Sequence, residues 1–75
     1  MYKPPMAPII AEIPPSRFTS IDGTKPKVGD VVQLDQGLTF PDGEPGCVVY
    51  LLGPNGESRY EAWVYESEIG PDVAA

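Results

Sequence analysis

Apolar residues gather in three segments of the chain, each with the length and composition of a β-strand. Residues 28–34 combine valines with a Gly-Asp turn, and residues 47–52 form an uninterrupted apolar run. Residues 58–65 instead alternate between apolar and polar positions, as a strand does when one of its faces is buried. The pattern predicts no helix of useful length, and it therefore favours a mostly β domain.

The third segment predicts both a core face and an outer face. Successive side chains of a strand point to opposite sides, so Tyr60, Ala62 and Val64 are expected to face the core together. The opposite face then takes Arg59, Glu61, Trp63 and Tyr65.

Two large aromatic side chains on an outer strand face require a cover. Trp63 and Tyr65, flanked by Glu61, are expected to lie under the folded-back N-terminal arm, a second copy of the chain or a different protein. A bulge in the strand would shift the alternation by one residue and place Trp63 in the core instead.

Turn-forming residues separate the three segments. Residues 35–45, rich in glycine and proline, predict a long irregular loop with Leu38 and Phe40 as inward anchors. Residues 53–56, Gly-Pro-Asn-Gly, predict a tight hairpin because Asn-Gly tolerates a positive φ. Residues 66–71 predict a single 3₁₀ turn followed by a short strand or a loose end.

The N-terminal third of the chain is rich in proline, which fixes φ and removes backbone donors. Six of the ten prolines lie before residue 28, so we expect residues 1–26 to form an extended arm, ordered only in part. Its apolar patch, residues 9–13, is expected to lie on a neighbouring surface of the same or another chain. Residues 27–71 form the predicted domain, and residues 72–75 a frayed tail.

The residue types present exclude several kinds of chemistry. The chain has one cysteine, Cys47, and no histidine, so it can form neither an intrachain disulfide nor a His/Cys zinc site. Nucleophile-and-base catalysis lacks its usual residues. The remaining acidic pairs, Glu66 with Glu68 and Asp42 with Glu44, fall in predicted exposed turns. We therefore expect no enzyme, no cofactor and no metal site.

The formal net charge of −6 is unevenly distributed along the chain. Residues 1–30 carry four basic and three acidic residues, a sum of +1, whereas residues 31–75 carry one basic and eight acidic residues, a sum of −7. Such a surface repels phosphate backbones, so we expect no nucleic-acid partner. The prolines near Met1 leave no apolar run for a signal peptide or membrane span, which predicts a cytoplasmic protein without a membrane partner.

The elements along the chain are, in order, a Val-Gly-Asp-x-Val opening, a loop, an apolar strand, a Gly/Asn hairpin and a Tyr-Glu-Ser-Glu-Ile turn. This order of elements resembles that of the small bacterial SH3-like barrels. The resemblance covers residues 27–71 and implies a five-stranded, strongly bent barrel. In size and layout the chain is also similar to the type II dihydrofolate reductases, whose Val-Gln-Ile-Tyr run lines a central pore. Here Val32-Gln33 is followed by Leu34-Asp35 in the first predicted strand, which is a departure from that motif.

These observations lead to two hypotheses about function. The first is a protein-interaction module that binds itself or a protein partner, with Trp63, Tyr65, Glu61, Glu66 and Glu68 as the binding residues. The alternative is a small oligomeric pore enzyme of the type II dihydrofolate reductase kind.

Overall fold

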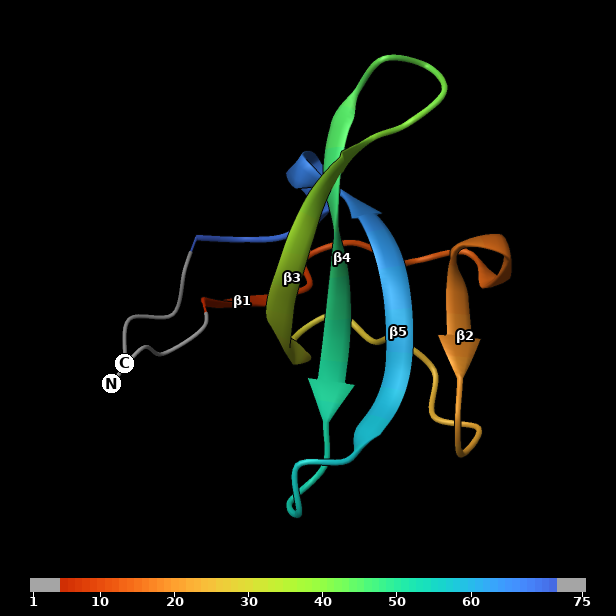
Figure 1. Cartoon of the computed structure of the whole chain (residues 1–75), viewed down its shortest axis with the longest axis vertical. Helices are drawn as coiled ribbons and strands as arrows, with labels where there is room; N and C mark the ends of the chain where they lie inside the picture. The colour runs from red at the N-terminus through yellow and green to blue at the C-terminus, as the bar shows by residue number, and fades with distance from the viewer. Residues whose placement is uncertain (1–4, 72–75) are drawn as a thin grey trace.

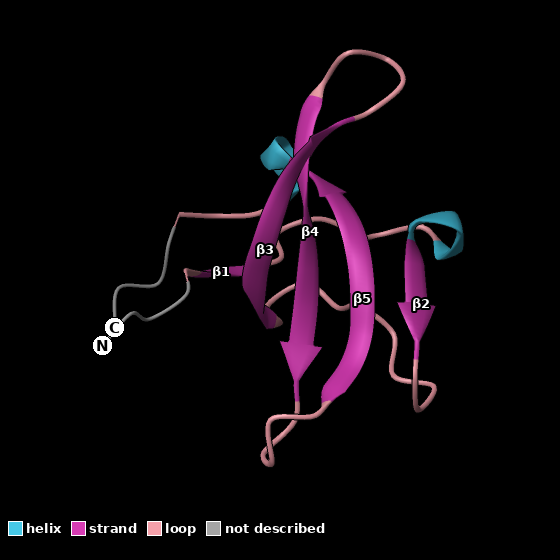
Figure 2. Ribbon diagram, viewed as in Figure 1, coloured by secondary structure: helices cyan, strands magenta, loops and turns pink. Residues whose placement is uncertain are grey.

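The computed structural model describes residues 5–71 and shows a mostly β protein (Figures 1 and 2). Five antiparallel strands form a single sheet in the order β1-β3-β4-β5-β2. The strands are β1 (Met6–Pro8), β2 (Phe18–Ser20), β3 (Val31–Thr39), β4 (Pro45–Leu52) and β5 (Ser58–Tyr65), and the 3₁₀ turns are η1 (Pro15–Arg17) and η2 (Glu66–Glu68). Residues 1–4 and 72–75, which include the start of the predicted arm and the predicted tail, lie outside the described residues. No helix within the described range has the length and apolar character needed to cross a membrane.

The core lies on one side of the central strands. Tyr60, Ala62 and Val64 are each fully buried, which confirms the alternation predicted for residues 58–65. The Tyr60 hydroxyl donates to the Asp30 carboxylate at 2.9 Å, so the polar end of this buried ring has a partner. Burial, together with this carboxylate, raises the pKa of Tyr60. The other buried members of the core cluster are Ile9, Ile13, Val32 and Val49.

The predicted N-terminal arm is built into the sheet instead of standing apart from it. β1 pairs with the start of β3, and β2 pairs with β5. Beyond β1, the backbone N–H of Ile9 donates to the carbonyl of Asp30 at 2.8 Å. Ala7, Ile9 and Ile13 are buried, and this burial offsets the entropic cost of ordering the proline-rich segment. In the described chain, two strands of the predicted arm, β1 and β2, therefore form the edges of the sheet.

β3 and β4 are longer than expected, because both strands extend into the segment predicted to be a loop. The remaining turn is closed by the N–H of Phe40, which donates to the carbonyl of Glu44 at 2.9 Å. The register of the pairing shifts between Leu34 and Gly37, where a β-bulge changes which side chains face the core. For this reason Leu38 and Phe40 do not belong to the core cluster, and the expectation of inward anchors was wrong.

The later connections follow the sequence pattern. In the β4–β5 hairpin, the N–H of Gly56 donates to the carbonyl of Gly53 at 3.0 Å, and Gly56 has a φ of 83°, a conformation that favours glycine. η2 is the single 3₁₀ turn expected after β5, and Ile69 behind it packs against the core.

The sheet is open within the described residues. After η2 the chain returns to the N-terminal segment, where Ile9 and Ile69 form an isolated antiparallel bridge. The N–H of Gly70 also donates to the carbonyl of Pro8 at 2.8 Å. These contacts tie the two ends of the described chain together without forming a further strand. The mostly β architecture is thus confirmed, whereas the barrel and its SH3-like identity stay predictions.

Candidate protein-binding face

The side of the sheet opposite the core carries a tryptophan paired with a valine. Trp63 on β5 lies directly opposite Val48 on β4, and the residues next to them along both strands point to the core. Val48 is only 6% exposed although it is not a member of the core cluster, so side chains of its own face must cover it. We call this surface the outer face; its members on β4 and β5 include Val48, Tyr50, Glu61, Trp63 and Tyr65.

Most of the described N-terminal segment lies on the core side of the sheet, but Arg17 reaches the outer face, where its guanidinium lies 4.8 Å from the centroid of the Tyr65 ring. Ile9 and Ile13 pack into the core from the opposite side. Figure 1 shows the chain between β1 and β2 passing behind the central strands. The pairing of β5 is regular around Trp63, which contradicts the alternative that a bulge turns the indole into the core. The start of the arm, residues 1–4, lies outside the described residues, and a second copy or a different protein as the cover of Trp63 stays a prediction.

A tyrosine hydroxyl on the outer face lies among carboxylates. Tyr50 is opposite Glu61 in the β4–β5 pairing, and its hydroxyl donates to Oδ2 of Asp35 at 3.3 Å. Glu61 is the main cause, with desolvation and Asp35, of a rise in the pKa of Tyr50 to about 12. Within residues 5–71, neither carboxylate forms an ion pair with a basic side chain. This part of the face therefore has a negative charge that is not neutralised locally.

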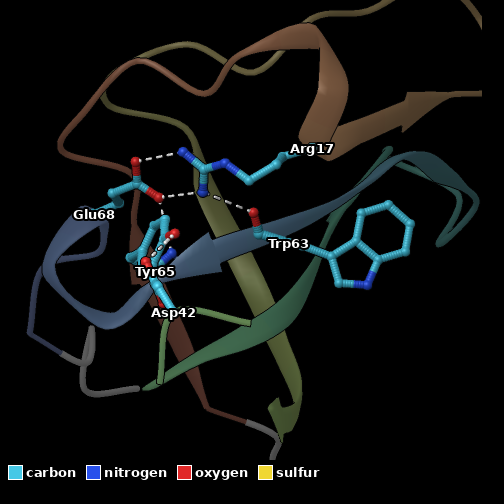
Figure 3. Close-up of polar contacts among 5 residues, drawn as sticks. All are labelled: Arg17, Asp42, Trp63, Tyr65 and Glu68. Carbon is cyan, nitrogen blue, oxygen red and sulfur yellow. Dashed lines mark hydrogen bonds and ion pairs between the residues drawn. The ribbon is translucent and has the colours of Figure 1, made fainter. Parts of the chain in front are cut away.

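One edge of the outer face is held by an ion pair between distant segments (Figure 3). Arg17, the last residue of η1, donates through Nη1 and Nη2 to the two carboxylate oxygens of Glu68, at 2.7 and 2.8 Å. Nη1 also donates to the carbonyl oxygen of Trp63 at 3.1 Å, and Glu68 accepts a bond from the N–H of Tyr65 at 2.8 Å. The Arg17 guanidinium lowers the pKa of Glu68, whose carboxylate in turn raises the pKa of Arg17.

The position of this ion pair explains its structural role. β2 pairs with β5 only as far as Ala62, so the backbone of Trp63 and Tyr65 lies beyond the last strand contact on that edge. The side chains of Arg17 and Glu68 bond to these backbone groups in place of a neighbouring strand. An edge occupied in this way is protected from pairing with another chain.

Tyr65 is fixed by the turn between β3 and β4. Its ring stacks on Phe40, with the centroids 4.1 Å apart and the planes 21° apart, and its hydroxyl donates to Oδ2 of Asp42 at 2.9 Å. The guanidinium of Arg17 lies 4.8 Å from the centroid of the Tyr65 ring. Gly46, opposite Tyr65 on β4, leaves the space that Phe40 occupies, because a Cβ at Gly46 would collide with that ring. In Figure 3 the indole of Trp63 projects away from this cluster.

No protein-family model, curated protein or solved structure matches the chain. The chemistry of the site must therefore be inferred from this chain alone. Burial and the nearby Glu66 raise the pKa of the Cys47 thiol, which disfavours the reactive thiolate. No group of three or more His, Cys, Asp or Glu residues in the described range can hold a metal ion. A partly buried indole beside carboxylates without ion pairs is an arrangement suited to binding.

The structure places only three of the five predicted binding residues on the outer face. Glu68 does not offer a free carboxylate, because both of its oxygens bond to a guanidinium. Glu66 is exposed but lines a depression of about 580 Å³ together with Cys47, which packs against the core side of the sheet. The residues that do share the outer face are Glu61, Trp63 and Tyr65.

Sequence reasoning missed three contributors to the outer face. Val48 and Tyr50 lie in a segment that is apolar on both faces, so only the cross-strand register assigns them to this side. Asp35 approaches Tyr50 from β3, next to the bulge, whereas the sequence pattern predicts a loop there. An Asp after an apolar run was the available signal, but it does not reveal which strand lies beside it.

Proposed function

We propose that the chain is a protein-interaction module whose outer face binds a segment with both apolar and basic side chains. The observation that carries the proposal is the pairing of Trp63 with Val48 on the face opposite the core cluster, to which the N-terminal segment contributes Ile9 and Ile13. Tryptophan is a frequent anchor of protein interfaces. Glu61 and Asp35 supply negative charge beside it, which attracts a basic partner and repels an acidic one.

The surroundings of the face favour binding without large rearrangement. Arg17 and Glu68 hold one edge, and the stacking of Phe40 on Tyr65 joins the β3–β4 turn to β5. A surface that is ordered before it meets its partner loses less conformational entropy on association. The net charge of −7 over residues 31–75 also disfavours phosphate backbones, which supports the prediction that the partner is not a nucleic acid.

A defined peptide tests the proposal. A short synthetic peptide that contains lysine and leucine should bind the chain, as measured by calorimetry, whereas its glutamate counterpart should not. Trp63→Ala should weaken this binding by about 2 kcal/mol, roughly thirtyfold, because it removes the anchor. Ile10→Ala is the matched control: Ile10 is 53% exposed and belongs to the N-terminal segment, so its loss should leave binding unchanged.

Two results would count against the proposal. Equal binding of the lysine and glutamate peptides would exclude the acidic rim as a source of selectivity, and equal binding by the Trp63→Ala chain would exclude the anchor. Circular dichroism of Trp63→Ala must show a folded protein, so that a loss of binding cannot be a loss of fold. The pore-enzyme alternative remains a prediction, and a dihydrofolate reductase assay on the purified chain tests it directly.

A further inference from the structure

The segment between β2 and β3 exposes apolar side chains beside basic ones. We call residues 21–30 the back loop. Ile21 is 73% exposed and Val28 is 65% exposed, the two largest values among the exposed large hydrophobic residues of the described chain. Lys25 and Lys27 are exposed as well, and no acidic group among residues 5–71 lies within ion-pair distance of either.

The two acidic residues of the back loop have internal partners. Asp22 accepts a bond from the N–H of Thr24 at 2.9 Å and lies 3.7 Å from Nη1 of Arg59. Asp30 accepts the Tyr60 hydroxyl at 2.9 Å through Oδ2. With these carboxylates engaged, the ammonium groups of the two lysines are the charges that the loop presents to a partner.

The back loop and the outer face lie on different sides of the sheet. In Figure 1 the back loop turns beyond the end of β2 at the edge of the sheet and then runs behind β5 and β4, on the side where the N-terminal segment also passes. The outer face is opposite the core cluster to which that segment contributes Ile9 and Ile13. The loop of one copy therefore does not cover the outer face of the same copy.

We infer that the outer face of one copy binds the back loop of a second copy. The inference rests on the proposed function and names its partner. The two surfaces are complementary in charge, because Lys25 and Lys27 would meet Glu61 and Asp35. They are also complementary in polarity, because an exposed apolar side chain of the loop, such as Val28, would cover the indole.

Two different surfaces joined in this way form a head-to-tail contact. Each copy binds one neighbour through its outer face and another through its back loop, so the contact builds chains or a ring instead of a closed two-fold dimer. Copies with a net charge of −6 repel one another at long range, but salt at physiological strength screens charges beyond about 8 Å. The association should therefore be weak and dependent on concentration.

A complementation experiment tests the head-to-tail contact by analytical ultracentrifugation across protein concentration. The loop variant, Lys25→Glu with Lys27→Glu, keeps the outer face, and the face variant, Trp63→Ala, keeps the back loop. Each variant alone should associate at least about tenfold more weakly than the unaltered chain. An equimolar mixture should form a one-to-one pair, because the intact loop of one binds the intact face of the other.

A second pair of substitutions distinguishes the effect of the charge at Glu61 on association from the effect of the net charge of the chain. Glu61→Lys should weaken association, whereas Glu44→Lys changes the net charge equally at an exposed site in the β3–β4 turn and should not. Equal effects of the two substitutions would overturn the assignment of Glu61 to the contact. Circular dichroism confirms that each variant is folded before association is compared.

The remaining outcomes separate this inference from the proposed function. If the loop variant alone still associates like the unaltered chain, the contact does not use the back loop and the inference is wrong. If the unaltered chain stays monomeric but binds the lysine and leucine peptide, the second copy is not the partner, while the proposed function stands. If it neither associates nor binds the peptide, both fail.

Discussion

Replacing Arg17 by methionine tests how the N-terminal segment is held against the end of β5. Methionine keeps an unbranched apolar stem but removes the guanidinium and its three hydrogen bonds. The carbonyl of Trp63 then loses its donor, and Glu68 keeps only the N–H of Tyr65.

The expected loss follows from the burial of this ion pair. The side chains of Arg17 and Glu68 are only 20% and 15% exposed. A hydrogen bond to a charged group contributes about 1.5–3 kcal/mol, whereas a fully exposed ion pair contributes less than about 1 kcal/mol. Because the three bonds share one head group and are not additive, we expect Arg17→Met to lower the free energy of unfolding by about 2–3 kcal/mol. Arg17→Lys should recover part of this loss, since lysine cannot donate to both oxygens in parallel.

The chain contains a matched control for this measurement. Arg59 pairs with Asp22 at 3.7 Å, and their side chains are 40% and 45% exposed. Arg59→Met should therefore cost less than about 0.5 kcal/mol. The free energy of unfolding is measured by urea unfolding followed by circular dichroism, for Arg17→Met, for Glu68→Gln and for the two substitutions combined. The double-mutant cycle gives the coupling energy between the two side chains, which we expect to be about 1–2 kcal/mol.

Similar small losses for the two arginine variants would refute the reasoning. They would show that the bidentate geometry at Arg17 contributes no more than an ordinary surface pair. A large loss for Arg17→Met with no coupling to Glu68 would instead assign the effect to stacking on Tyr65, over whose ring the guanidinium lies.

Three further predictions follow from particular contacts. Arg17 lowers the pKa of Glu68, so the stability that this carboxylate contributes is present above its unfolded pKa of about 4.3 and is lost as pH falls. On acid titration, Glu68→Gln should therefore lose less of its free energy of unfolding than the unaltered chain. Ile9→Ala should cost about 2–4 kcal/mol in urea unfolding because Ile9 is fully buried, whereas Ile10→Ala should cost less than about 0.5 kcal/mol. Gly46→Ala should cost about 1–3 kcal/mol, and Phe40→Ala in the same chain should relieve part of it, since the added Cβ meets the Phe40 ring.

Local patterning accounted for the elements whose neighbours lie close in sequence. β5 has the predicted bounds and the predicted buried residues, because strict alternation over eight residues specifies a half-buried strand. The hairpin at Gly53–Gly56 and the 3₁₀ turn after β5 were also predictable, since each depends on a few adjacent residues.

The binding face was predictable only in part. The alternation of β5 placed Glu61 and Trp63 outside the core, and the pairing of the sheet agrees with this. The same pattern could not show that Glu68 is engaged by Arg17, because 51 residues separate them in the chain. Nor could it show that Asp35 lies beside Tyr50, because the bulge in β3 decides that contact.

The sequence by itself determined that this is a mostly β protein, which face of β5 is buried and where an unusual outer tryptophan lies. These properties depend on the two-residue period of a strand and on the backbone preferences of glycine and proline. Only the tertiary structure decided that the proline-rich segment joins the sheet. Burial of Ile9 and Ile13 stabilises the fold only where the other strands present an apolar surface for these side chains to pack on. The same holds for the charges: which carboxylates remain without an ion pair depends on contacts between distant segments, and those contacts define the face that we propose for binding.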